Sequence, residues 1–140
     1  METIDLRPKL MSFRATSFHG ENNAASSAQE PWKIELTQLI EVGLGAQTGM
    51  PAQLQALVKI DLSAKASKEK AADQVANFNA SYEAKFEYPI AVTEADILPR
   101  FQQQPYQYML AAQVFPLAMT HFRREMQSMG FDARNLPLGL

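Results

Sequence analysis

The segment that decides the fold is YQYMLAAQVFPLAMTHFRREMQSM, residues 106–129, which is followed by Gly130. Its length, its lack of turn-forming residues apart from Pro116, and the glycine after its end predict one long helix. The second half has a single narrow apolar stripe, whereas the first half is apolar on all sides. A helix with one apolar stripe packs on one surface, but a helix that is apolar all round has to be covered twice.

The second cover is expected to come from another copy of the chain, because a chain of this size has few residues left to supply it. We predict that one side of residues 106–119 packs on a sheet and that the other side lies at an oligomer interface. Leu110 and Leu117 are assigned to one side, and Phe115 and Ala118 to the other. The residues expected at the oligomer interface are Leu110, Val114, Phe115, Leu117 and Ala118.

The composition is that of an ordinary globular protein of 140 residues, for which a single domain spanning residues 1–140 is expected. The chain has no cysteine, which excludes disulfides and thiolate metal sites. The net charge of -2 and the absence of a basic block argue against nucleic acid as a partner. No apolar run reaches the ~20 residues that span a bilayer, and the N-terminus lacks a signal-peptide core, so a cytoplasmic location is expected.

Ahead of the helix, four segments alternate apolar and polar residues as half-buried strands do. The first covers residues 9–18 and is followed by a loop, 19–31, that is too long for a hairpin turn. The second begins at Trp32, and its alternation is broken at Gln38 and Leu39 in the manner of a bulge. The side chains of the first strand that are predicted to face the core are Met11, Phe13 and Ala15.

The third and fourth strands, 53–65 and 75–88, alternate most regularly and are joined by a charged turn at 66–73. A glycine-rich turn at 43–51 precedes them, so the two strands are predicted to be antiparallel neighbours. The residues expected beneath the long helix are Val58, Ile60, Phe78 and Tyr82. The predicted fold is α+β: a four-stranded antiparallel sheet with one face in solvent and the long C-terminal helix packed on the other.

A short helix is predicted between the sheet and the long helix. Thr93 is suited to cap it, Glu94 and Asp96 supply negative charge to its first turn, and Pro99 and Pro105 limit its length.

Residues capable of catalysis or metal binding form no recognisable arrangement. His19 and His121 are far apart in the sequence, and each is interpreted as a solvated or capped side chain, because a metal site needs several ligands at suitable spacing. Glu83 and Glu87 share the solvent face with Lys85, which favours cross-strand ion pairs over acid–base catalysis. The segment GLGAQTG lacks the G-x-G-x-x-G spacing and joins two strands. We therefore expect no enzymatic activity, no cofactor and no metal site.

The remaining candidates for function are apolar. Trp32 follows Pro31 at the end of the long loop, where its ring can either anchor the loop or line a groove, and the sequence favours neither interpretation. The long helix is rich in methionine, which suits surfaces that accept varied partners, although most of these side chains are expected in the core.

The chain resembles the SecB family of export chaperones over about residues 11–137. The order of four strands and a long helix matches, with a long loop between the first two strands. Three segments carry the local similarity: EPWKIEL at 30–36, VFPLA at 114–118, and Asn135 with Leu136 before Pro137. The resemblance implies a homotetramer built as a dimer of dimers, with grooves that hold unfolded preproteins. For this chain a homo-oligomer is expected, either a dimer or a tetramer. It also implies peptide-binding roles for Pro31, Trp32 and Phe18.

The chain departs from the SecB pattern in ways that qualify the functional expectation. It resembles a divergent, shortened member, since the family has a further helix and tail. Its solvent face carries nearly balanced charge, so docking of a SecA-like translocase through a negative field is not expected.

Three hypotheses follow. The leading one is a chaperone for non-native polypeptide, serving protein export and translocation or a dedicated client such as an antitoxin. The alternative is an interaction or assembly subunit, associated with a phage or a toxin–antitoxin system, that lacks general chaperone activity. A small-ligand or enzymatic domain ranks last, because no set of polar residues points into a pocket between the sheet and the helix.

Overall fold

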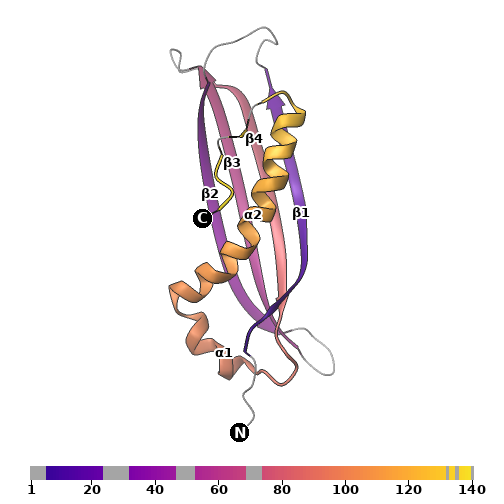
Figure 1. Cartoon of the computed structure of the whole chain (residues 1–140), viewed down its shortest axis with the longest axis vertical. Helices are drawn as coiled ribbons and strands as arrows, with labels where there is room; N and C mark the ends of the chain where they lie inside the picture. The colour runs from indigo at the N-terminus through magenta and orange to yellow at the C-terminus, as the bar shows by residue number, and fades with distance from the viewer. Residues whose placement is uncertain are drawn as a thin grey trace.

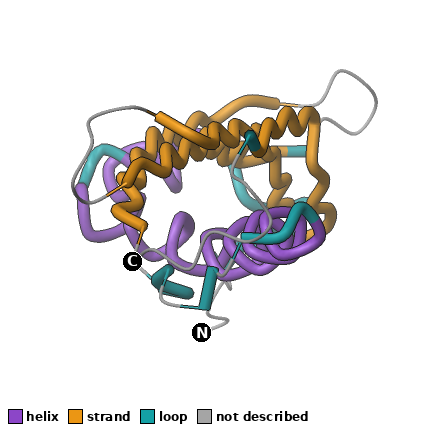
Figure 2. Tube along the Cα trace, turned by 90° about the horizontal axis from the view of Figure 1, so that it is seen from above, coloured by secondary structure: helices purple, strands orange, loops and turns teal. Residues whose placement is uncertain are grey.

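The computed structural model describes residues 6–23, 32–46, 53–68, 74–131, 133–134 and 136–139, except for the side chains of Trp32, Lys68 and Gln74. Its elements are β1 (Lys9–Asn22), β2 (Trp32–Ala46), β3 (Leu54–Lys68), β4 (Gln74–Glu87), α1 (Glu94–Phe101) and α2 (Gln104–Ser128). The strands form one antiparallel sheet in the order β1-β4-β3-β2. Both helices lie on the same face of this sheet (Figures 1 and 2). The predicted α+β fold is confirmed.

The core lies between the inner faces of β3 and β4 and the buried side of α2. Val58, Ile60, Phe78 and Tyr82 are each at most 1% exposed. β3 and β4 are antiparallel neighbours, with Ile60 opposite Tyr82. The strict alternation of these two strands put every second side chain beneath the helix, so the prediction for both strands is confirmed.

β1 deviates from simple alternation because it is bulged. Its register against β4 shifts between Leu10 and Ser12 and again between Ala15 and Ser17. Each shift inserts one extra residue, which exchanges the two faces of the strand beyond it. The prediction that Met11 faces the core is therefore wrong, and its side chain is 49% exposed. The β1 side chains that pack on the core are those of Leu10, Phe13 and Phe18.

β2 is regular throughout, and the bulge predicted at Gln38 and Leu39 is absent. Its pairing with β3 runs without a shift, with Gln38 opposite Leu62 and Leu39 opposite Asp61. Gln38 therefore takes an inward position, whereas Leu39 points into solvent on the outer face. A polar residue on the inner face is tolerated here because β2 lies at the edge of the sheet.

Three strands are longer than predicted. The small or polar composition of residues 19–22, 43–46 and 66–68 predicts loops, but these residues pair with their neighbours as strand. Cross-strand hydrogen bonding in a long sheet overrides the weak local preferences of these residues.

α1 begins at the predicted cap. The Thr93 backbone N–H donates to an Asp96 carboxylate oxygen at 2.9 Å, and the Thr93 hydroxyl contacts the same oxygen at 3.0 Å. These hydrogen bonds lower the pKa of Asp96 below its ordinary value. Pro99 lies inside α1 and does not end it, since the helix continues to Phe101.

α2 crosses the sheet diagonally, from the β2 edge at its start to the β1 edge at its end (Figure 1). It ends in a Schellman motif: the Gly130 N–H donates to Gln127 O and the Phe131 N–H to Met126 O, each at 3.0 Å. Gly130 has φ 89°, a conformation that glycine adopts without strain. The chain then turns back over the sheet, and Phe131 and Ala133 are buried.

A hydrogen bond joins the C-terminal end of α2 to the C-terminal end of β1. Asn22 donates its side-chain amide to Met129 O at 2.6 Å. A Cβ atom at Gly20 would lie 2.5 Å from the Met129 sulfur, so a larger residue there would have to displace the Met129 side chain. No helix in the described part of the chain is long and apolar enough to cross a membrane.

Candidate functional site

A groove lies between the edge strand β2 and the first half of α2. The diagonal course of α2 leaves this space, because the helix starts beside β2 and moves away from it along its length (Figure 1). The groove has a volume of about 410 Å³, within the range of roughly 300–1,000 Å³ that ligand pockets occupy. Its lining residues are Gln38, Ile40, Val42, Gln104, Gln107, Tyr108 and Ala111.

The groove combines an apolar floor with an uncharged polar rim. Ile40 and Val42 project from the inner face of β2 and are half-buried. The Gln107 side chain is held by donation to Phe101 O at 2.8 Å, while Tyr108 remains 55% exposed. None of the described lining residues is charged. A site with amides and a phenol around aliphatic side chains can accept apolar groups and a polypeptide backbone together.

The strand beside the groove is an open edge. β2 is the last strand of the sheet, and no other described strand pairs with its outer side. Exposed edge strands are usually blunted by bulges or inward-pointing charges. β1, the opposite edge, has two bulges, whereas β2 has no register shift, and Glu41 is the only charged residue from Thr37 to Ala46. The β2 edge can therefore receive another strand.

The predicted peptide-binding residues do not form one cluster in the described structure. Pro31 and the side chain of Trp32 lie outside the described residues, although Trp32 does begin β2 as predicted. Phe18 is on β1, at the other edge of the sheet, and is half-buried. Its ring lies 6.5 Å from that of Phe78 and 6.2 Å from that of Phe122. The binding roles of these three residues stay predictions, and the sheet order separates Phe18 from Trp32 by two strands.

The predicted interface residues divide into covered and exposed side chains. Leu110, Val114, Phe115 and Ala118 have 0% exposure within their own chain, so the sheet already covers them and they offer no surface to a second subunit. Leu117 is 41% exposed. The prediction that Leu110 and Leu117 share one covered side of the helix is therefore wrong. The buried side rotates gradually around the axis of α2, because the helix crosses a twisted sheet.

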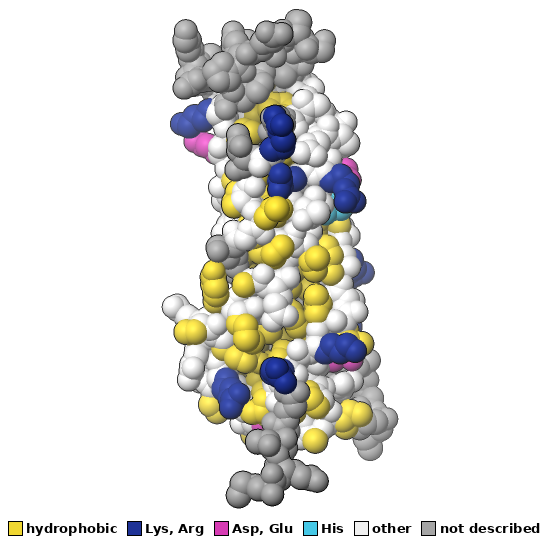
Figure 3. Space-filling model, viewed as in Figure 1, with side chains coloured by type: hydrophobic (Ala, Val, Ile, Leu, Met, Phe, Trp, Pro, Cys, Tyr) yellow, Lys and Arg dark blue, Asp and Glu magenta, His cyan; other side chains and the backbone are white. Residues whose placement is uncertain are grey.

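The outward side of the first half of α2 is nevertheless apolar. Apart from Tyr108, which stands at the groove rim, its uncovered or partly covered residues are Pro105, Met109, Ala112, Gln113, Pro116, Leu117 and Thr120, none of them charged. Figure 3 shows hydrophobic side chains gathered on this face, with cationic groups around them. The prediction that a second subunit covers this half of the helix stays open, with this outward stripe as its surface.

The two histidines have structural surroundings. His121 Nδ1 lies 2.9 Å from the Tyr82 hydroxyl, and its Nε2 lies 3.7 Å from a Glu125 oxygen. Burial raises the pKa of Tyr82, with a further contribution from Glu125, so its hydroxyl stays protonated. His19 lies on the outer face near Glu21. Among the described residues, no group of three or more acidic or histidine side chains could hold a metal ion.

The outer face of the sheet carries charges in alternating order. Arg14, Glu83, Lys59 and Glu41 follow one another across the four strands in one row of the register. Arg14 and Glu83 form an ion pair at 3.5 Å. A face that alternates in sign presents no extended negative field to a partner.

The groove residues Gln38, Gln104, Gln107 and Tyr108 were not identified from the sequence. The one available signal was Gln38, a polar residue that interrupts an alternating strand. The broken alternation predicts a bulge, but Gln38 occupies an inner-face position that the core does not fully cover.

A four-stranded antiparallel sheet with a long C-terminal helix on one face defines the SecB-like α+β fold. The structure is similar to that of the SecB-like chaperone Rv1957 from Mycobacterium tuberculosis in complex with a ChAD peptide from the Rv1956 HigA1 antitoxin. The TM-score is 0.63 and the identity 14%, covering 94% of this chain and 90% of the other. No protein-family model and no curated protein sequence matches the chain. The similarity is therefore one of fold.

Proposed function

We propose that this chain binds non-native polypeptide segments in the groove between β2 and α2 and acts as a SecB-like chaperone. The observation that carries the proposal is a groove with no charged residue in its described lining, beside a bulge-free edge strand whose outer side pairs with no other described strand. Unfolded segments share exposed apolar side chains and an unpaired backbone. The groove is suited to the apolar side chains, and the edge of β2 is suited to the unpaired backbone.

The SecB-like neighbour supports a polypeptide ligand, since that protein was solved with an antitoxin peptide. A dedicated client of this kind, or preproteins in export and translocation, are the substrates we propose. A SecA-like partner docking on a negative sheet face is not part of the proposal, because Arg14 and Lys59 alternate with Glu83 and Glu41 there.

We also propose that the chain forms a homo-oligomer, a dimer or a tetramer, through the outward apolar stripe of α2. An exposed uncharged helix face at the surface of a single chain is typical of an interaction site. Leu117 lies within this stripe and is the member of the predicted interface set that its own chain leaves open.

The test uses a lysine placed on either face of β2. Gln38→Lys puts an inward-pointing charge at the groove, the device by which natural edge strands resist pairing. Gln38 is exposed, so the variant should fold with an unchanged Tm. It should weaken binding of a permanently unfolded client, such as reduced and carboxymethylated α-lactalbumin, by roughly tenfold or more in Kd.

The matched control is Thr37→Lys, the neighbouring residue of the same strand, which is exposed on the outer face. There the new charge remains in water, so client binding should be retained. Equal losses in both variants, or none in Gln38→Lys, would contradict the proposed site. If the wild-type protein binds no unfolded client but does bind one defined partner, the interaction-subunit alternative replaces the chaperone.

A further inference from the structure

Two glycines of β2 are required by nothing in the described part of the chain. Gly43 and Gly45 lie in the regular, paired part of the strand. Among the described glycines only Gly130 has positive φ, so the backbone at these positions would accept any residue. A Cβ atom added to either glycine meets no atom of the described residues within 4 Å. Because glycine weakens a strand, its presence where nothing requires it indicates space left for something else.

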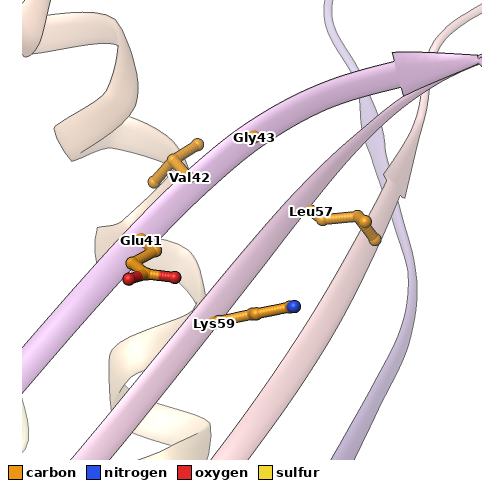
Figure 4. A pocket seen from close by; sticks show the side chains of 5 residues that line it. All are labelled: Glu41, Val42, Gly43, Leu57 and Lys59. Carbon is orange, nitrogen blue, oxygen red and sulfur yellow. The ribbon is translucent and has the colours of Figure 1, made fainter.

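That space is a notch on the outer face of the sheet. It has a volume of about 240 Å³ and is lined by Glu41, Val42, Gly43, Leu57 and Lys59. Leu57 lies directly opposite Gly43 on β3 and forms its apolar wall. Figure 4 shows Leu57 and Lys59 on one side of the sheet and Val42 directed away from them, toward the helix.

The notch and the groove lie on opposite faces of the same strand edge. Val42 lines both, with Ile40 and Gln38 on the groove side and Gly43 and Glu41 on the notch side. A ligand lying only on one face of the sheet fills one hollow. An extended strand paired to the β2 edge directs successive side chains to alternate faces and fills both at once.

We propose that the polypeptide ligand binds as an added strand along residues 38–46 and sets an aromatic side chain over Gly43, against Leu57. The inference rests on the proposed function and names the sequence preference of its site. A glycine beside a flat cross-strand ring is a favourable pair, because the ring covers the exposed backbone that glycine leaves. On the groove side, the ligand residues that lie opposite Val42 and Ile40 are aliphatic and contact these two side chains.

The ligand is inferred to be a segment of another protein and not β2 of a second copy. Between residues 33 and 41, the side chains of β2 that point to the outer face are Lys33, Glu35, Thr37, Leu39 and Glu41. None is aromatic, so antiparallel pairing of two β2 strands through these residues would leave the notch without a ring.

The experiment compares two short soluble peptides in which valine alternates with serine and threonine. One carries phenylalanine at the central polar position and the other carries alanine. Wild-type protein should bind the phenylalanine peptide roughly three- to tenfold more tightly. Gly43→Val fills the notch with a residue that favours strands, so the Tm should be unchanged or higher and the preference for phenylalanine should vanish.

The control is Ser12→Val, which adds the same side chain to the same cross-strand row at the opposite edge: Ser12 pairs with Lys85, Lys85 with Leu57, and Leu57 with Gly43. Ser12→Val should keep the preference. If wild type binds both peptides equally well, or if Gly43→Val retains the preference, the inference is overturned while the proposed function stands.

Two further outcomes separate a failure of the proposed function from a wrong assignment of the ligand. If wild type binds neither peptide nor unfolded α-lactalbumin, the proposed function fails and the inference fails with it. If Gly43→Val changes the mass of the assembly measured by light scattering and leaves peptide binding intact, the β2 edge belongs to a second copy and the inferred ligand is wrong.

Discussion

Truncation of Tyr108 measures how much the groove contributes to polypeptide binding. The side chain stands at the groove rim and is 55% exposed. An aromatic side chain buries roughly 150–250 Å² in a contact, so a ligand can cover about 100 Å² of this one. At ~25 cal/mol per Å² that area corresponds to an upper limit of ~2.5 kcal/mol. Ordering of the ring and the ligand on binding offsets part of this free energy, so the expected contribution of Tyr108 to binding is ~1–2 kcal/mol.

We therefore expect Tyr108→Ala to raise the Kd for an unfolded client roughly five- to thirtyfold. Fluorescence anisotropy of a labelled client measures this, with the Tm of each variant as a check on folding. Tyr108→Phe keeps the ring and should stay within roughly threefold of wild type, because most of the contribution is ring area. Gln127→Ala, exposed near the other end of α2, is the control and should bind normally. If Tyr108→Ala folds and binds like wild type, the groove does not hold the client.

Four other outcomes are expected. Trp32→Ala should weaken client binding by ~1–3 kcal/mol with the oligomer intact, whereas Glu83→Gln on the outer face should leave it unchanged; dissociation of Trp32→Ala would make Trp32 a structural residue. Leu117→Arg should lower the mass of the oligomer in analytical ultracentrifugation, and a wild-type monomer at micromolar concentration would refute the interface. Gly130→Ala should lower the free energy of unfolding in urea by ~1–2 kcal/mol, since φ is 89° there; an unchanged value would show that the helix end relaxes. Because the folded-state pKa of Asp96 is lowered, the ionised Asp96 stabilises the fold above its ordinary pKa of 3.8, and this stabilisation is lost as the pH falls below that value. Asp96→Asn should remove this part of the loss of stability in acid. Identical pH profiles of stability for the variant and wild type would refute the role of Asp96.

Local sequence pattern was sufficient for the elements of this protein whose two faces differ strongly. The alternation of β3 and β4 predicted Ile60 and Tyr82 in the core, and both are buried. The period of α2 and the position of Gly130 predicted its length and its end. Each of these patterns reflects contact with one large apolar surface, so each can be identified without knowledge of the neighbouring element.

Local pattern failed where a residue's surroundings depend on strands distant in sequence. Met11 alternates correctly, but a bulge against β4 turns it into solvent. Gln38 breaks the alternation because α2 leaves the edge of β2 uncovered, which depends on the diagonal path of a helix more than sixty residues away. The apolar side chains of α2 are similar in sequence, yet Phe115 is buried and Leu117 is exposed.

The sequence by itself therefore determined the number and order of the strands and helices, and that the long helix packs on one face of the sheet, since these follow from the periodicity of burial along the chain. The candidate site was decided only by the tertiary structure. Strand order made β2 an edge, and the diagonal packing of α2 opened the groove beside Ile40 and Val42. Unpaired backbone and unfilled space arise from the placement of whole elements relative to one another, and no residue type or spacing along the chain encodes them locally.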